Sequence, residues 1–270
     1  MSRFIKFEAV ENARDMGGLE TAHGHMIRSG VLLRSGNLSR ATDADVAILR
    51  GQFNLTDVFD FRFDKEAAAD PDRRIPGVRY TSLPTLPLEM IQGFSSGRSD
   101  AEQENSRDFV ASLVRYASVP QAQALARRLY PSIISSPVSQ RHYGEFLRGL
   151  LYAPGGSLWH CSQGKDRAGL ASAFLLAALG ADEETIIADF DESNTYYDPY
   201  VEQLSAKVRF TGGDDDAIDF IRAMVGVSVK NFRAGLELID SCYGSLSSYV
   251  QNQLGFTAPE CARLRERYLE

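Results

Sequence analysis

The chain has 270 residues, 44% of them hydrophobic and 24% charged, so it is long enough to bury the core of one domain. Its net charge of −7 disfavours general affinity for nucleic acid or anionic membranes, so any binding of an anion must be local. The longest apolar stretch, residues 168–181, contains glycine and serine and is too short to cross a bilayer.

The first residues and the cysteines bear on where the protein works. Every apolar run near the N-terminus contains a charge, so we expect no signal peptide and a cytoplasmic protein, or one exported without a classical signal. The three cysteines, Cys161, Cys242 and Cys261, are odd in number and lack metal-ligand spacing. This argues against a disulfide framework and a zinc site, so at least one thiol should be free.

The first half of the chain alternates extended and helical patterns. Thr42 is typical of a helix N-cap and Gly51 of a helix end, while Pro84 and Pro87 close an extended run. A stretch rich in glycine and serine follows at residues 93–99. The expected elements are strands at residues 31–34, 55–61 and 78–83 and helices at residues 43–50, 109–116, 122–134 and 143–152.

The second half is predicted to be mainly helical. A short apolar strand at residues 157–160 precedes an apolar helix at residues 168–179, which Gly180 ends. The chain has no repeat and no low-complexity linker, so we expect one domain over residues 1–270. Its predicted class is α/β, with a central, mostly parallel sheet flanked by helices and a helical C-terminal half. The remaining predicted helices cover residues 183–190, 217–225, 232–243 and 259–269.

The loop of residues 161–167 lies between that strand and that helix and carries the predicted chemistry. Ligands of α/β sheets bind at the carboxyl ends of strands, where loop amides and the positive end of a helix attract an anion. Gly164 would permit the close backbone approach that several converging amides require. The ligand should be a phosphate or a close mimic. The predicted substrate-binding residues are Ser162, Gln163, Gly164, Lys165 and Ala168.

Two residues of this loop are the predicted catalytic pair. A helix N-terminus with Lys165 and Arg167 nearby favours the thiolate form of Cys161, which would act as the nucleophile. Arg167 offers a planar fork that can bind two phosphoryl oxygens, as a lysine cannot. The Cys-x5-Arg spacing alone is weak evidence, because Cys261 and Arg267 also satisfy it, but that second match has no glycine and no preceding strand. We therefore predict a phosphatase.

Residues 160–169, His-Cys-Ser-Gln-Gly-Lys-Asp-Arg-Ala-Gly, resemble the loop of the protein tyrosine phosphatase superfamily, and in particular its bacterial branch of tyrosine and lipid phosphatases. The resemblance implies a phosphatase fold, a phosphocysteine intermediate, no metal or cofactor, and activity on phosphotyrosine, phosphoserine or phosphothreonine, and phosphoinositides. It also implies a helical insertion or lid at residues 200–232. The similarity extends to residues 12–18, 34–40, 57–62 and 189–194 and to Tyr243-Gly-Ser-Leu, with residues 86–135 the least similar.

A general acid must protonate the leaving group, and Asp166 is the first candidate. Many tyrosine phosphatases carry this acid after a Trp-Pro pair, whereas the single tryptophan here lies before the cysteine, and the resembling branch has an aspartate inside the loop. The alternative is that Asp166 braces the loop, with Asp60 as the next candidate acid. Asp60, Arg62 and His160 are expected to support the site through buried hydrogen bonds or ion pairs.

Other interpretations stay open. The loop could belong to a phosphate-binding module that has lost catalysis, although Cys161 and Arg167 are both retained. It could also belong to a rhodanese-like sulfurtransferase, although the Gly-Lys-Asp-Arg run suits a phosphoryl oxyanion better than a persulfide. Arg14 and Asp15 are expected to pair with each other near the pocket. The expected partner is a phosphorylated protein or phosphoinositide substrate, with no nucleic acid and no stable membrane insertion; the sequence leaves the oligomeric state open.

Overall fold

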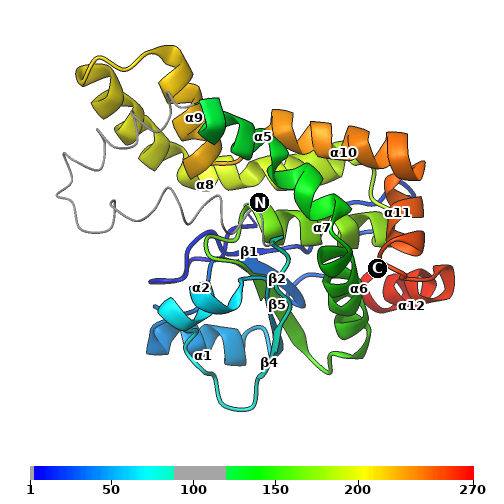
Figure 1. The fold of residues 1–270 in the computed structure, drawn as a ribbon. Helices are drawn as coiled ribbons and strands as arrows, with labels where there is room; N and C mark the ends of the chain where they lie inside the picture. Colours follow the sequence, from blue (N-terminus) through cyan, green and yellow to red (C-terminus); the bar gives the residue numbers. More distant parts are fainter. Residues whose placement is uncertain (1–2, 88–119) are drawn as a thin grey trace.

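The computed structural model describes residues 3–87 and 120–270, so the predicted helix at 109–116 and the stretch at 93–99 lie outside the described residues (Figure 1). Within the described part, a five-stranded sheet has the order β1-β2-β5-β3-β4. Strands β2, β5, β3 and β4 are parallel to one another, and β1 pairs antiparallel with β2. The predicted mostly parallel sheet is confirmed. The strands are β1 Arg14–Asp15, β2 Leu32–Ser35, β3 Leu55–Asp60, β4 Arg79–Ser82 and β5 Gly156–His160.

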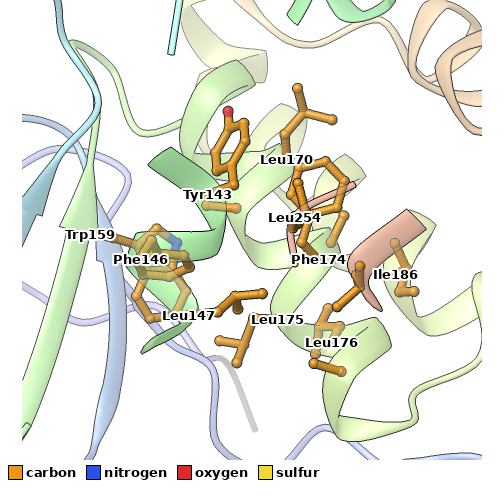
Figure 2. Packing of buried hydrophobic residues seen from close by; sticks show 14 of the residues in the cluster. Tyr143, Phe146, Leu147, Trp159, Leu170, Phe174, Leu175, Leu176, Ile186 and Leu254 are labelled. Atoms are coloured by element: carbon orange, nitrogen blue, oxygen red, sulfur yellow. The ribbon is translucent and has the colours of Figure 1, made fainter. Parts of the chain in front are cut away.

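The sheet separates two hydrophobic cores, because successive side chains of a strand point to opposite faces. Leu158 of β5 belongs to the smaller core with Leu49 of helix α1 (Asp43–Gly51). Trp159 belongs to the larger core, which α6 (Pro137–Tyr152) and α7 (Asp166–Leu179) cover. Figure 2 shows part of this larger core, where Phe146 lies against Trp159 with ring centroids 5.3 Å apart. The cores on both faces fix the strand that leads into the predicted catalytic loop.

Local signals explain where the helices around the loop begin and end. Thr42 caps α1 in a capping box, as predicted. Ser136 caps α6 and Pro137 occupies its first turn, so this helix begins six residues before the predicted start. Gly180 ends α7 in a left-handed conformation with φ +92°. The other helices are α2 Asp64–Ala69, α5 Pro120–Ser135, α8 Glu183–Phe210, α9 Asp215–Val225, α10 Val229–Tyr243, α11 Leu246–Asn252 and α12 Ala258–Tyr268.

Helix α8 is much longer than predicted, because it continues past residue 190 to Phe210 despite Pro199. Its second half presents buried apolar residues at intervals of four, three and four: Tyr197, Val201, Leu204 and Val208. The last two of these pack against α9 in a separate small cluster. This packing outweighs the hydrogen bond lost at the proline. The hairpin of α8 and α9 lies at one end of the molecule (Figure 1).

Two further sequence predictions concern the second Cys-x5-Arg match and membrane spans. Cys261 is buried within α12, so the second Cys-x5-Arg match lies on a helix, as predicted for residues 259–269. None of the helices in the described residues combines the length and apolar character needed to span a membrane.

Candidate active site

The predicted catalytic loop lies at the carboxyl end of β5, where Cys161 follows the last strand residue and α7 begins at Asp166. The loop lies against the end of β2. Gly164 has φ +67°, and a Cβ atom on it would lie 2.2 Å from the carbonyl oxygen of Ser35. Only glycine fits this position, because the backbones approach too closely for any side chain. The strand, loop and helix therefore meet as the sequence predicted.

Donors outside the loop hold its first carbonyl groups. The backbone N–H and the side-chain amide of Asn37 donate to the carbonyl of Ser162, at 3.2 and 3.1 Å. The carbonyl of Gln163 accepts hydrogen bonds from the Asn12 amide at 3.1 Å and from the Tyr197 hydroxyl at 2.9 Å. These donors come from the N-terminal segment, the β2–α1 connection and α8. They turn the first peptide oxygens of the loop away from its centre.

Arg34 holds the rest of the loop from beneath. Its Nε donates to the carbonyl of Gly164 at 2.8 Å, and its Nη2 donates to the carbonyl of Lys165 at 2.7 Å. In the described part of the chain, the amides of residues 162–168 donate to no protein acceptor. With the carbonyls held outward, these amides are left to bind an anion, which is the arrangement of an anion-binding nest.

A buried carboxylate neutralises the arginines beneath the loop. Asp189 lies 2.9 Å from Nη1 of Arg34, 3.5 Å from Nε of Arg14 and 2.8 Å from Nη2 of Arg3. Burial alone would raise the pKa of Asp189, but the three arginines lower it to about 2. Burial and the neighbouring Arg14 lower the pKa of Arg34 to about 9, which leaves it charged at neutral pH. Arg14 therefore pairs with Asp189, and the expected pair of Arg14 with Asp15 is wrong.

Arg167 is held by a residue that the sequence did not single out. Glu66 of α2 accepts from its Nη1 at 2.6 Å and from its Nη2 at 2.9 Å. The hydroxyl of Ser162 bridges the pair, 2.9 Å from Glu66 and 3.2 Å from Arg167. Burial would lower the pKa of Arg167, but the negative charges of Cys161 and Glu66 raise it. Glu66 binds the end of the fork, and Nε donates to no acceptor in the described residues, so a phosphoryl group would bind the Nε edge by displacing the Ser162 hydroxyl from Nη2.

Asp166 lies in the first turn of α7, and one of its oxygens is already bonded. The hydroxyl of Tyr130, from α5, donates to its Oδ1 at 2.6 Å. The Tyr130 side chain is buried, whereas Asp166 is partly exposed. Sequence reasoning missed this partner, because nothing near Tyr130 in the chain links it to the loop.

Lys165 points away from the centre of the loop. Its ammonium group donates to the carbonyls of Met224, at 2.5 Å, and Val225, at 2.8 Å, at the end of α9. Burial lowers its pKa, although the charges of Asp166 and Cys161 raise it. A cation suits the negative end of a helix. Lys165 thus connects the loop to the hairpin of α8 and α9.

The predicted supporting residues form one buried network under the strand ends. Arg62 binds Asp60 through Nε and Nη2, and its Nη2 lies 3.0 Å from Asp72. The Nε2 atom of His160 lies 3.1 Å from Asp72. Burial alone would lower the pKa of His160, but the neighbouring Asp72 and Asp60 outweigh burial and raise the pKa. Asp60, Asp72 and His160 are close enough to share a cation, but the guanidinium of Arg62 already supplies positive charge to both carboxylates.

The last two predicted substrate-binding residues occupy different settings. Gln163 is exposed at the outer side of the loop, where its side chain faces solvent. Ala168 is buried in the first turn of α7, and its carbonyl accepts from Nε1 of Trp159 at 3.3 Å. Of the predicted set, the structure therefore brings together Cys161, Ser162 and Arg167 at one position.

Comparison with known proteins identifies the family. A model described as the tyrosine phosphatase family matches residues 5–270. The chain belongs to the tyrosine phosphatase family. It is 30% identical to a Cupriavidus necator protein assigned by name to the tyrosine-protein phosphatases, covering 98% of this chain and 88% of that protein. It is 29% identical to the triple specificity protein phosphatase PtpB of Mycobacterium tuberculosis, covering 89% and 90% of the two chains.

One solved structure resembles this tyrosine phosphatase family member more distantly. The crystal structure of P. aeruginosa TpbA matches 74% of this chain and 89% of that chain, at 22% identity. The TM-score is 0.29, too low for structural conclusions.

Proposed function

We propose that this phosphatase hydrolyses phosphomonoesters through a phosphocysteine formed on Cys161. The observation that carries the proposal is the loop itself: outside donors hold its carbonyls, its amides are left to bind an anion, and Arg167 lies at its end. A dianionic phosphoryl group is the ligand that suits this combination. Position and electrostatics supply most of phosphoryl-transfer catalysis.

In the first step, the Sγ atom of Cys161 attacks phosphorus, and the bond from phosphorus to the leaving oxygen breaks. Asp166 gives its proton to that oxygen, and Arg167 binds two oxygens of the transferred group. In the second step, water attacks the phosphocysteine while the Asp166 carboxylate takes a proton from it. Inorganic phosphate and the thiolate are the products.

Phosphotyrosine is the proposed substrate class, with phosphoserine, phosphothreonine and phosphoinositides as further substrates. The name of PtpB, a triple specificity phosphatase, supports breadth of this kind. For a phosphoinositide, the ammonium of Lys165 would have to leave the carbonyls of Met224 and Val225 before it could bind a second phosphate. Lys165→Ala should then lower kcat/KM for both substrates, and the loss of transition-state stabilisation should be ~1–2 kcal/mol larger for the phosphoinositide than for phosphotyrosine. If the ratio of the two kcat/KM values is unchanged in the variant, Lys165 does not determine selectivity for lipids.

The decisive test replaces the nucleophile. Cys161→Ser should abolish release of phosphate from p-nitrophenyl phosphate while keeping affinity for inorganic phosphate, because the loop amides and Arg167 remain. Cys242→Ser and Cys261→Ser are matched controls, one exposed and one buried, and should keep full activity. Turnover by the Cys161→Ser variant would disprove the mechanism.

The alternatives give other results in the same assays. A binding module would bind phosphate without any turnover by the unmodified protein. A sulfurtransferase would take sulfur from thiosulfate. Mild peroxide should inactivate the phosphatase reversibly, and bound phosphate should protect Cys161.

A further inference from the structure

Tyr130 is fixed in place by aromatic rings from two other helices. Its ring meets those of Phe190 in α8 and Phe232 in α10 edge-on, with centroids 5.7 and 6.0 Å apart. Those two rings stack on each other at 3.9 Å. Gly235 lets α10 approach, since a Cβ atom there would lie 3.1 Å from the Cβ of Tyr130. With the side chain only 2% exposed, the hydroxyl has one fixed direction.

That hydroxyl is directed at Asp166. The distance of 2.6 Å to Oδ1 is typical of an O–H donor bonded to a carboxylate. Burial, together with the charge of Asp166, raises the pKa of Tyr130 well above its usual value, so the phenol keeps its proton. Tyr130 is therefore a lasting donor, and Asp166 Oδ1 is its acceptor in both protonation states of the acid.

This arrangement matters at the moment of proton transfer. With Oδ1 accepting from Tyr130, the proton that Asp166 passes to the leaving oxygen is carried on Oδ2. As the phosphorus–oxygen bond breaks and that proton departs, negative charge develops over the carboxylate. A hydrogen bond to a charged acceptor is about twice as strong as one to a neutral acceptor. A donor already in place thus stabilises the transition state more than the ground state.

We propose that Tyr130 is a positioning residue for the general acid: it directs the acidic proton to Asp166 Oδ2 and stabilises the carboxylate formed when the leaving group is protonated. The proposal rests on the proposed function, in which Asp166 is the acid. It adds the prediction that Tyr130 is needed only for leaving groups that require protonation. In this role Tyr130 acts through Asp166, to which its hydroxyl donates.

The test compares Tyr130→Phe with the unmodified phosphatase on two substrates. For an alkyl phosphate, whose leaving group is poor, kcat/KM should fall by ~10–100-fold, the range expected for loss of one donor to a developing charge. The p-nitrophenolate group of p-nitrophenyl phosphate leaves without protonation. For this substrate, kcat/KM of Tyr130→Phe should stay within about twofold of the unmodified enzyme. Tyr249→Phe is the matched control, because its hydroxyl is also buried but donates to the carbonyl of Ile134 in α5 rather than to the loop, and its loss should leave both rates unchanged.

A double variant separates this proposal from the proposed function. In Asp166→Asn, the added Tyr130→Phe change should cost nothing further, because the acid is already absent. The proposal would be overturned if Tyr130→Phe lowered kcat/KM further in the Asp166→Asn background, or lowered it equally for both substrates. Tyr130 would then serve only the stability of the fold. If Asp166→Asn itself has no leaving-group dependence, the acid role fails and the Tyr130 role fails with it. The phosphocysteine mechanism would still stand on the Cys161→Ser result.

Discussion

Asp189→Asn tests the charge balance beneath the catalytic loop. The substitution keeps the shape of the side chain and removes its charge, so Arg14 and Arg34 lose a carboxylate that lies within 3.5 Å of both. Both arginine side chains are fully buried. Removing one partner of a buried ion pair costs ~3–5 kcal/mol, a large part of a typical stability of ~5–15 kcal/mol. We expect Asp189→Asn to lose at least ~3 kcal/mol of unfolding free energy.

The pH dependence provides an independent check. The folded-state pKa of Asp189 is about 2, below the ~3.9 of an unfolded aspartate. Its charge therefore contributes stability above about pH 4, and that contribution is lost as the pH falls through about 2. The shift corresponds to ~2–3 kcal/mol. The unfolding free energies of the unmodified protein and of Asp189→Asn should therefore become more alike as the pH is lowered from neutrality towards about 3.

Urea unfolding at a series of pH values measures both effects, and the affinity for inorganic phosphate reports the loop. Phosphate should bind more weakly to Asp189→Asn, because Arg34 positions the carbonyls of Gly164 and Lys165. Asp45→Asn is the matched control: Asp45 is buried, but it accepts from the backbone amides of Glu8 and Ala9 and not from the arginines beneath the loop. The charge balance beneath the loop would be refuted if Asp189→Asn lost less than ~1 kcal/mol of unfolding free energy and bound phosphate as tightly as the unmodified protein.

Three further substitutions test the loop directly. Arg167→Lys should lower kcat/KM by ~2–4 kcal/mol, because an ammonium cannot bind two oxygens as a fork does, and a variant within a few-fold of the unmodified enzyme would place the clamp elsewhere. Glu66→Gln should weaken inhibition by phosphate roughly tenfold, because Arg167 loses the charged partner that orients it, whereas tighter inhibition would mean that Glu66 competes with the substrate. Gly164→Ala should lose activity and at least ~2 kcal/mol of stability, because its Cβ would meet the carbonyl of Ser35 at 2.2 Å; a stable, active variant would contradict that close contact.

The sequence predicted the parts of the site that are continuous in the chain. A strand, a glycine-containing loop and a helix ended by glycine have local signals, and the structure places Cys161 and Arg167 within that unit. Helix α8 was predicted too short, with its end at residue 190 instead of residue 210. Its buried residues at intervals of three and four, from Tyr197 to Val208, were the signal for its true length.

The partners of the loop could not be predicted in the same way. Glu66 lies in a short helix that has no buried residue. Tyr130 and Asp189 have no local sequence pattern that links them to Arg167 or Asp166. Their roles come from side chains that meet only in the folded chain. The similarity at residues 12–18, 34–40 and 189–194 marked the segments that hold the loop, but not what each residue contacts.

The donors that shape the loop have a consequence for folding. Asn12, Arg34 and Asn37 donate to carbonyls of residues 162–165, which are between 125 and 152 positions further along the chain. Contacts of such large sequence separation close late, because the chain between them must first lose its conformational entropy. During synthesis, these N-terminal residues emerge long before the loop they hold. The anion site should therefore mature among the last parts of the molecule, and recovery of phosphate binding during refolding should follow the slowest phase rather than the formation of helices.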